Sequence, residues 1–303
     1  MRGRRRNGPV LALFLLPALL LFVGLVLGPI VLGLYTSFFS WNGFGGLPTQ
    51  FVGLANFTRL WSDDVFLGDL QRGLILIVLS VGIQLPVSLG LALLVNQPIR
   101  GRSVYRVLFF APYVLSEVIT AVLFTMLLSP NNGLVNNLLG LLPGDVQQTW
   151  LANPDTVLYA VFVVVSWKYF GFHMVLYLAA RQSIPQELTE AASSDGANAW
   201  QVFRHVTLPL LGPTIRISIF LSVIGTIQLF DLVWVLTGGG PVHGSETMAV
   251  TLFQYGFKRF EVGYASAISV TMFLICLVFA LVYQRFVLRR DLEGAMTVLG
   301  AAK

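Results

Sequence analysis

Three ionisable side chains, Glu117, Lys168 and Asp231, interrupt stretches of sequence that are otherwise apolar enough to lie inside a membrane. Placing a charge at membrane depth costs about 2.5–3.5 kcal/mol on insertion scales, so each of these groups needs a partner or a function. Amide and aromatic neighbours accompany them, with Gln228 three positions before Asp231 and Tyr169 directly after Lys168. Carboxylates, amides and aromatic rings together suit a sugar, whose hydroxyls take the hydrogen bonds while its C–H face packs on a ring. These five residues are therefore candidates for a polar pathway through the membrane.

A purely structural role for the same charges is the alternative. Lys168 could form an ion pair with Asp231 or with Glu117 and so hold the helices together. Both interpretations fit the sequence. Each carboxylate also belongs to a row of polar and aromatic residues at helical spacing, which predicts one shared helix face for each row: Gln228, Asp231 and Trp234, and Tyr113, Glu117, Thr120 and Phe124.

The composition of the chain indicates a membrane protein. Of its 303 residues, 56% are hydrophobic and only 11% are charged, which is too few charges to cover a water-soluble protein of this size. Six apolar stretches have the roughly 20 residues that a helix needs to cross a bilayer, without the polar alternation of barrel strands. We therefore predict an all-α polytopic membrane protein with six transmembrane helices, at Val10–Phe38, Gly73–Val95, Val104–Leu128, Thr156–Ala180, Thr214–Thr237 and Val262–Phe286.

Basic residues predict the orientation of these helices, because Lys and Arg are enriched in cytoplasmic loops. With a cytoplasmic N-terminus, 14 of the 19 Lys and Arg residues fall inside, four fall outside, and Lys168 lies within a span. Both termini are then cytoplasmic. The net charge of +5 reflects this topology, and nothing in the sequence suggests nucleic-acid binding. The predicted organisation is a basic N-terminus (1–9), a six-helix transmembrane domain (10–287) with a cytoplasmic loop at 181–213, and a C-terminal tail (288–303).

The cytoplasmic loop contains two short amphipathic helical patterns. Ser183 and Gln186 match a capping box for the first pattern, and Gly196 suits its end, where a positive φ is common. A second short pattern follows, and we expect Pro209 to stop it. The apolar face of such a helix pair needs a partner, which could be the lipid interface, the chain's own helices or a soluble protein.

The order of residues in this loop is more specific than its amphipathic character. It runs Glu190-Ala191-Ala192, Asp195-Gly196-Ala197, Phe203, Val206, Leu208-Pro209 and Pro213. This motif resembles the EAA loop of ABC importer permeases, which forms a coupling helix that docks into a groove of a cytoplasmic ATPase subunit. Two small alanines would permit close approach, and a carboxylate could bind a basic or amide partner. The resemblance implies a set of ATPase-coupling residues: Glu190, Ala191, Ala192, Asp195, Gly196 and Phe203.

A second signature follows the fifth predicted span and reads QLFDLVWVLTGGGPVHGSETMAVTLFQYGF, with Gly263-Tyr264-Ala265 after it. Its three glycines predict a tight external turn, and the apolar residues beyond them predict a short interfacial or re-entrant helix. Together with SPNNGLVNNLLG before the fourth span, the segment resembles carbohydrate-uptake permeases of the maltose and glycerol-phosphate transporter type. The TGGGP turn and the N-terminal run of the chain resemble the first of the two different permease subunits that such importers usually have.

This resemblance implies a type I ABC importer permease fold and a non-catalytic subunit that forms half of a pathway for a sugar, an oligosaccharide or glycerol phosphate. The implied location is the cell (inner) membrane of a bacterium or archaeon. The implied partners are membrane lipid, a second and different permease in a heterodimer, a dimer of ATPase subunits, and an extracytoplasmic solute-binding protein. No cofactor is expected on this chain, because it has no G-x-x-x-x-G-K-[ST] sequence; ATP and Mg²⁺ would bind the ATPase.

An ion-coupled secondary transporter is the alternative function, with Glu117 and Asp231 as its coupling carboxylates. Such transporters often show matching interrupted helices in two halves, and the sequence shows no such pairing. An intramembrane enzyme fits less well. The histidines at 173, 205 and 243 are scattered without metal-ligand spacing, and no nucleophile lies beside a base. No catalytic residue and no metal ligand is therefore predicted.

Overall fold

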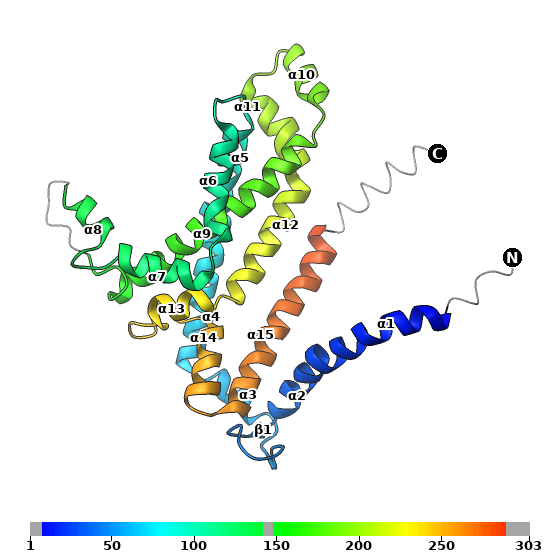
Figure 1. The fold of residues 1–303 in the computed structure, drawn as a ribbon, viewed down its shortest axis with the longest axis vertical. Coiled ribbons are helices and arrows are strands. Elements are labelled where there is room, and N and C mark those ends of the chain that lie inside the picture. The colour runs from blue at the N-terminus through cyan, green and yellow to red at the C-terminus, as the bar shows by residue number, and fades with distance from the viewer. Residues whose placement is uncertain (1–7, 142–147, 289–303) are drawn as a thin grey trace. The chain divides into compact units, whose positions relative to one another are not determined.

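The computed structural model describes residues 8–141 and 148–288, and helices make up almost all of this part of the chain (Figure 1). Its described strands, β1 (Phe39–Ser40) and β2 (Gln50–Phe51), form a short antiparallel pair in which Phe39 lies opposite Phe51. Several basic residues on which the predicted orientation depends lie outside the described residues: Arg2, Arg4, Arg5, Arg6, Arg289, Arg290 and Lys303.

The helices follow one another as α1 (Gly8–Phe22), α2 (Gly28–Thr36), α3 (Ala55–Leu60), α4 (Asp64–Leu79), α5 (Leu85–Asn96), α6 (Arg102–Val114), α7 (Glu117–Leu127), α8 (Leu134–Leu139), α9 (Pro154–Gln182), α10 (Gln186–Ser194), α11 (Ala199–Val202), α12 (Leu208–Ile227), α13 (Asp231–Thr237), α14 (Met248–Phe253) and α15 (Val262–Tyr283). Turns of π-helix join or extend several of them, at Val23–Leu27, Ser80–Gln84, Phe203–Thr207, Gln254–Lys258 and Gln284–Leu288. Such turns often occur at functional sites.

Within the described residues, five helical segments are long and apolar enough to cross a membrane: Leu13–Thr36, Asp64–Asn96, Pro154–Gln182, Ala199–Ile227 and Val262–Leu288. A sixth candidate is the pair formed by α6 and α7, which are bent by 100° relative to each other. The predicted all-α polytopic fold is therefore confirmed, with six spans if the bent pair counts as one of them.

The third span is not the continuous helix that the sequence predicts at Val104–Leu128. α6 ends before Leu115 and Ser116, which are extended, and α7 begins directly after them. The hydroxyl of Ser116 accepts a hydrogen bond of 3.2 Å from the backbone N–H of Ile119 and so caps the new helix. Hydropathy did not reveal the break, because the residues on both sides of it are apolar.

The fifth span also differs from its predicted bounds of Thr214–Thr237. Pro209 does not stop the preceding helix, because it follows directly on the π-helical turn Phe203–Thr207, where the backbone already departs from the regular hydrogen-bond ladder to which a proline cannot donate. The π-helical turn Phe203–Thr207 joins α11 to α12, so one helical segment runs from Ala199 to Ile227.

A break at residues 228–230 separates α12 from α13. The hydroxyl of Thr247 donates a hydrogen bond of 2.7 Å to the backbone oxygen of Leu229 and so satisfies a carbonyl that the helix leaves free. The helical rows predicted from spacing are divided by these two breaks, so neither Gln228 with Asp231 nor Tyr113 with Glu117 shares one continuous helix.

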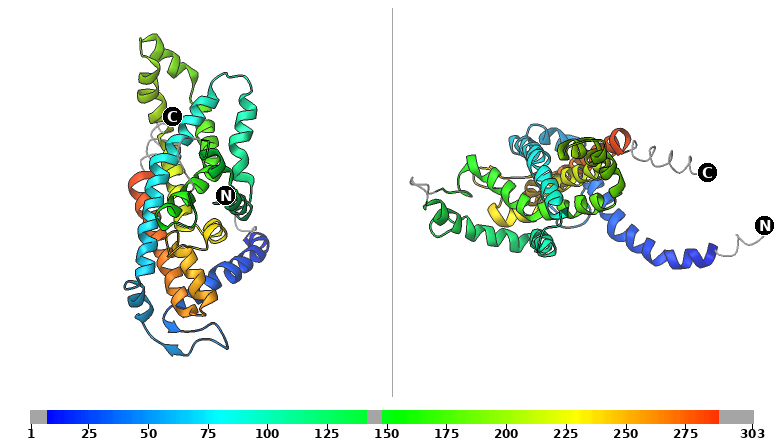
Figure 2. Two further views of the ribbon diagram at one scale, coloured as in Figure 1. Left: turned by 90° about the vertical axis from the view of Figure 1, so that its left-hand side faces the viewer. Right: turned by 90° about the horizontal axis from the view of Figure 1, so that it is seen from above.

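The larger of two compact units comprises, among the described residues, 65–141, 148–250 and 275–288. α9 packs against both α5 and α6 (Figures 1 and 2). Gly171 allows the approach of α6, since a Cβ at this position would lie 1.9 Å from the backbone oxygen of Phe109. The core of the unit lies between α7, α9 and α13 and includes Ala121, Phe124, Val161, Val164, Leu232 and Val233.

The smaller unit comprises, among the described residues, 8–64 and 251–274. The hydroxyls of Tyr255 and Tyr264 donate hydrogen bonds of 3.0 and 2.8 Å to one carboxylate oxygen of Asp63. Burial, and then the hydrogen bond to Asp63, raises the pKa of Tyr255, so its hydroxyl remains a hydrogen-bond donor to a higher pH than that of an exposed tyrosine. This cluster joins the end of α3 to the segment around the start of α15.

Replacing Asp63 with Ala should destabilise the smaller unit, because two buried tyrosine hydroxyls then lose their acceptor. Tyr255 is 7% exposed and Tyr264 is 2% exposed, and each unsatisfied buried group costs roughly 1–3 kcal/mol. Thermal unfolding in detergent should shift clearly downward for Asp63→Ala and much less for Asp63→Asn, whose amide oxygen can still accept both hydrogen bonds. Equal unfolding temperatures for both variants and the unchanged protein would contradict this role.

Candidate functional site

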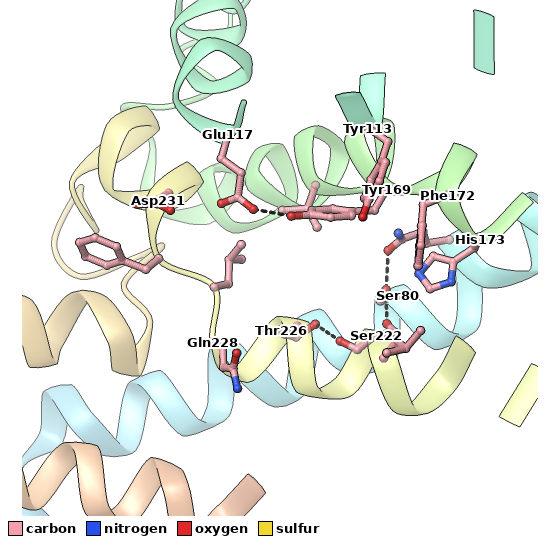
Figure 3. A pocket seen from close by; sticks show the side chains of 16 residues that line it. Ser80, Tyr113, Glu117, Tyr169, Phe172, His173, Ser222, Thr226, Gln228 and Asp231 are labelled. Atoms are coloured by element: carbon pink, nitrogen blue, oxygen red, sulfur yellow. Dashed lines mark hydrogen bonds between the residues drawn. The ribbon is translucent and has the colours of Figure 1, made fainter. Parts of the chain in front are cut away.

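Residues beside both helix breaks line one cavity of about 380 Å³ in the larger unit (Figure 3). α9, α12 and the π-helical turn Ser80–Gln84 complete its wall. Four of the five pathway candidates from the sequence are in this lining. The described lining residues are Ser80, Gln84, Tyr113, Glu117, Val165, Tyr169, Phe172, His173, Leu221, Ser222, Gly225, Thr226, Gln228, Leu229, Phe230 and Asp231.

The two carboxylates of the cavity, Glu117 and Asp231, each occupy the first turn of a short helix, α7 and α13 respectively. Acidic residues are favoured there because the free N–H groups at a helix start carry partial positive charge. The hydroxyl of Tyr169 donates a hydrogen bond to Glu117 Oε1. Figure 3 shows Asp231 beside this pair, so the breaks gather both carboxylates at one part of the cavity.

Lys168 is not among the described residues that line this cavity. Its ammonium group donates a hydrogen bond to the backbone oxygen of Leu115 and a longer one, of 3.5 Å, to that of Tyr113. These carbonyls lie at the end of α6. No further turn of helix follows, so they have no backbone N–H group of the same helix from which to accept a hydrogen bond. Lys168 is 3% exposed and lines a neighbouring hollow together with Glu117 and Tyr169. In this position it stabilises the helix break.

Neutral polar groups line the part of the cavity formed by the π-helical turn and α12. The hydroxyl of Ser80 donates a hydrogen bond to the amide oxygen of Gln84 and lies 2.8 Å from the hydroxyl of Ser222. Gln228, at the end of α12, lies across the cavity from Glu117 in Figure 3. Ser80, Gln84 and Ser222 are not predictable from the sequence, because single hydroxyls and amides in apolar helices usually bond within the helix bundle and form no periodic pattern.

Aromatic rings and a histidine complete the cavity. Tyr113 and Phe172 stack with ring centroids 4.9 Å apart and planes inclined by 22°. His173 meets the ring of Phe172 edge-on, at 5.2 Å between centroids, and is only 3% exposed. No described residue forms a hydrogen bond with its Nδ1 atom. Buried polar atoms nearly always have a partner, so this nitrogen is an unsatisfied polar group in the wall of the cavity.

The predicted coupling segment lies at the surface of the larger unit. α10 buries none of its residues. Just beyond it Gly196 has a φ of 86°, which confirms the positive φ predicted for the helix end. Trp200 is 64% exposed, and its ring lies 5.4 Å from that of Phe203. Of the predicted coupling residues, Ala192 and Phe203 are half-buried, and the exposed ones are Glu190, Ala191, Asp195 and Gly196.

The capping box of this segment is not at the predicted position. The hydroxyl of Ser183 donates a hydrogen bond of 2.7 Å to the backbone oxygen of Ala180, because α9 extends almost to this point. Asn198 and Gln201 form the box instead, each side chain accepting from the other residue's backbone N–H, at 2.9 and 2.8 Å. The box therefore fixes the start of α11, and with it the start of the long segment that ends at the cavity.

Comparison with known proteins finds relatives along almost the whole chain. The family model described as "Binding-protein-dependent transport system inner membrane component" matches residues 84–291. A protein named "probable ABC transporter permease" from Pyrococcus horikoshii is 35% identical over 278 residues, which cover 91% of this chain and 94% of the relative. A permease of the sulfoquinovosyl glycerol transport system of Agrobacterium fabrum is 32% identical over 279 residues, covering 92% and 90%.

Crystal structures of a bacterial ABC transporter for import of the acidic polysaccharide alginate show a similar fold. One has a TM-score of 0.83 at 26% identity and covers 94% of this chain and 96% of its own. A second, of the transporter in complex with an alginate pentasaccharide-bound periplasmic protein, has a TM-score of 0.82 with the same identity and coverage.

Proposed function

Because the chain belongs to the binding-protein-dependent permeases of ABC importers, which are non-catalytic components of the inner membrane, we propose that it forms half of a translocation pathway for a carbohydrate-type solute. An external binding protein delivers the solute, and a separate ATPase pair drives its movement. The observation that carries this proposal is the cavity at the two helix breaks, which combines carboxylates, hydroxyls and stacked aromatic rings.

The chemistry of the cavity supports a sugar or an oligosaccharide as the solute; glycerol phosphate, the third solute that the sequence implies, is the anionic member of that set. Glu117 and Asp231 offer acceptors for hydroxyl groups, and Gln228 offers both a donor and an acceptor. The stacked rings of Tyr113 and Phe172 offer an apolar surface for a sugar's C–H face. Two relatives are named for transport of sulfoquinovosyl glycerol and of alginate, which are both carbohydrate-type solutes.

The assignment of Tyr169 and Lys168 to the pathway is part of the same proposal. Tyr169 holds the carboxylate of Glu117 through its hydroxyl and so orients it toward the cavity. Lys168 acts one step further away, because it secures the end of α6 from which Tyr113 projects. In this account Tyr169 touches the solute and Lys168 positions the residues that do.

Coupling to the ATPase is proposed to run through residues 181–213. α10 buries none of its residues, so its exposed surface is available to a cytoplasmic partner. The helical segment Ala199–Ile227 then connects this surface to the cavity without interruption, and it ends one residue before Gln228. Movement of the docked ATPase subunits would therefore be carried by a continuous helix to the break beside Asp231. ATP and Mg²⁺ would bind the ATPase subunits.

A complete importer on this proposal also contains a second, different permease, which supplies the other half of the pathway. The chain is a multi-pass protein of the inner membrane of a bacterium or archaeon. We propose cytoplasmic termini, because that orientation places 14 of the 19 Lys and Arg residues inside and agrees with a cytoplasmic coupling segment within the domain at 10–287.

Purification from the native membrane, with identification of bound partners by mass, tests the proposal directly. An ATPase, a second permease and a solute-binding protein should accompany the chain. After reconstitution in lipid vesicles, uptake should require both ATP on the cytoplasmic side and the loaded binding protein. A chain that purifies alone, and that moves solute in ATP-depleted vesicles under an imposed ion gradient, would instead support an ion-coupled transporter that uses Glu117 and Asp231.

A further inference from the structure

The charged groups that face the cavity have one sign. Its described lining includes Glu117 and Asp231 but no Lys or Arg. Tyr169 donates its hydroxyl proton to Oε1 of Glu117, so this oxygen acts as an acceptor beside the cavity. Lys168 is close by, but its ammonium group is directed at backbone oxygens where α6 ends. An anionic group of a solute would therefore meet two negative charges in the cavity and no free positive one among its described lining residues.

A second, independent observation indicates that neutral hydrogen-bonding ligands fit the remainder of the cavity. His173 lines the cavity and is only 3% exposed. Its Nδ1 atom forms no hydrogen bond with any described residue. Ser80 and Ser222 add hydroxyls that can donate or accept. The faces of Tyr113 and Phe172 carry the negative side of the ring quadrupole, which packs well on C–H groups and poorly on anions.

We propose that this subunit selects neutral polyhydroxylated solutes over their phosphate, sulfonate or carboxylate derivatives, and that Glu117 and Asp231 are the discriminating pair. The inference rests on the proposed carbohydrate function and narrows it. Hydroxyl groups form charge-assisted hydrogen bonds with both carboxylates, whereas an anion is repelled by them in surroundings of low dielectric constant. Discrimination then arises from a repulsive element as well as from attractive contacts.

Family membership does not decide this point. The alginate transporter imports an acidic polysaccharide, so the shared fold accommodates charged solutes as well. The charge preference of the present chain is therefore a property of its own cavity residues.

The test compares matched neutral and anionic probes on the complete importer, held in lipid nanodiscs without the binding protein, which would otherwise contribute its own selection. The pairs are glucose with glucose 6-phosphate, glucose with glucuronate, and glycerol with sn-glycerol 3-phosphate. Equilibrium binding of each radiolabelled probe is measured for the unchanged importer and for Glu117→Gln, Asp231→Asn and the double variant. Asp155→Asn removes an equivalent charge from the exposed first turn of α9, outside the described cavity lining, and serves as the matched control.

The unchanged importer should bind the neutral member of at least one pair about tenfold more tightly than the anionic member, and the double variant should reduce that ratio by about tenfold. Asp155→Asn should leave it unchanged. Gln228→Lys, which places a cation at the cavity, should tighten binding of the anionic probe, and it keeps the inference testable if the double variant fails to assemble. The second permease is identical in every sample, so the differences belong to this chain.

Equal binding of neutral and anionic probes, or a ratio that Glu117→Gln and Asp231→Asn leave unchanged, would overturn the charge selection and leave the carbohydrate function standing. A different result would contradict the function itself. If no probe binds and none is taken up with ATP and binding protein present, the cavity is not a carbohydrate pathway and the inference falls with it.

Discussion

The rate of ATP-driven uptake should fall at least about tenfold in an importer that carries Ala191→Arg, while the permease itself folds normally. Ala191 is exposed on α10, which buries none of its residues, so a longer side chain meets no obstacle within the described chain. At the proposed ATPase contact, however, the small residue is replaced by a long charged side chain that prevents close approach. Loss of a central interface contact costs about 2 kcal/mol or more, which is sufficient for this effect.

Ser193→Arg is the matched control for this prediction. Ser193 is also exposed on α10, but two residues along a helix correspond to a rotation of about 200°, so it lies on the opposite side. Uptake into vesicles, stimulation of ATP hydrolysis by the loaded binding protein, and co-elution of the ATPase should all fall for Ala191→Arg and change little for Ser193→Arg. Full coupled uptake by the Ala191→Arg importer would mean that the ATPase docks elsewhere and that α10 is an ordinary cytoplasmic connector.

Gly171→Val should prevent stable packing of α6 on α9 and lower the stability of the protein by about 3 kcal/mol or more, the upper part of the range for overpacked interiors. A Cβ at position 171 would lie 1.9 Å from the backbone oxygen of Phe109 and 2.7 Å from its carbonyl carbon. Backbone atoms cannot turn aside as a flexible side chain can, so the whole of α6 must move away. That movement also displaces Tyr113 and the carbonyls that Lys168 bonds, so binding at the cavity should be lost together with stability.

Gly90→Val provides the comparison, because Gly90 is an exposed residue of α5 and a Cβ at this position would meet no neighbouring atom within 4 Å. Thermal unfolding and size-exclusion chromatography in detergent should show a large loss of folded protein for Gly171→Val and little change for Gly90→Val. Unfolding at the same temperature in both variants would show that α6 and α9 do not depend on this close contact.

The sequence by itself determined the class of the protein and most of its spans, and it predicted a coupling segment. Hydropathy identifies a membrane-crossing helix because the segment itself must be apolar along its whole length. The signal is therefore contained within that one stretch of sequence. The positive φ of Gly196 was likewise predictable, because a helix that ends there needs a left-handed residue and glycine adopts that conformation without a steric penalty. Four of the five pathway candidates line the cavity, and charged and amide groups could be singled out in the sequence because they are conspicuous in apolar surroundings.

The tertiary structure alone decided where the helices break and what completes the cavity. The backbone oxygens of Leu115 and Leu229, at the two helix breaks, accept hydrogen bonds from Lys168 and Thr247, which lie in distant segments of the chain. Likewise the hydroxyls of Ser80 and Ser222 meet although they are 142 positions apart in the sequence. A helix end needs partners for its free backbone groups, and when these come from distant segments no local pattern records them. Lys168 is an example. The sequence shows only that a lysine within an apolar span is unusual, whereas its hydrogen bonds to the backbone oxygens of Tyr113 and Leu115 show that it stabilises the end of α6.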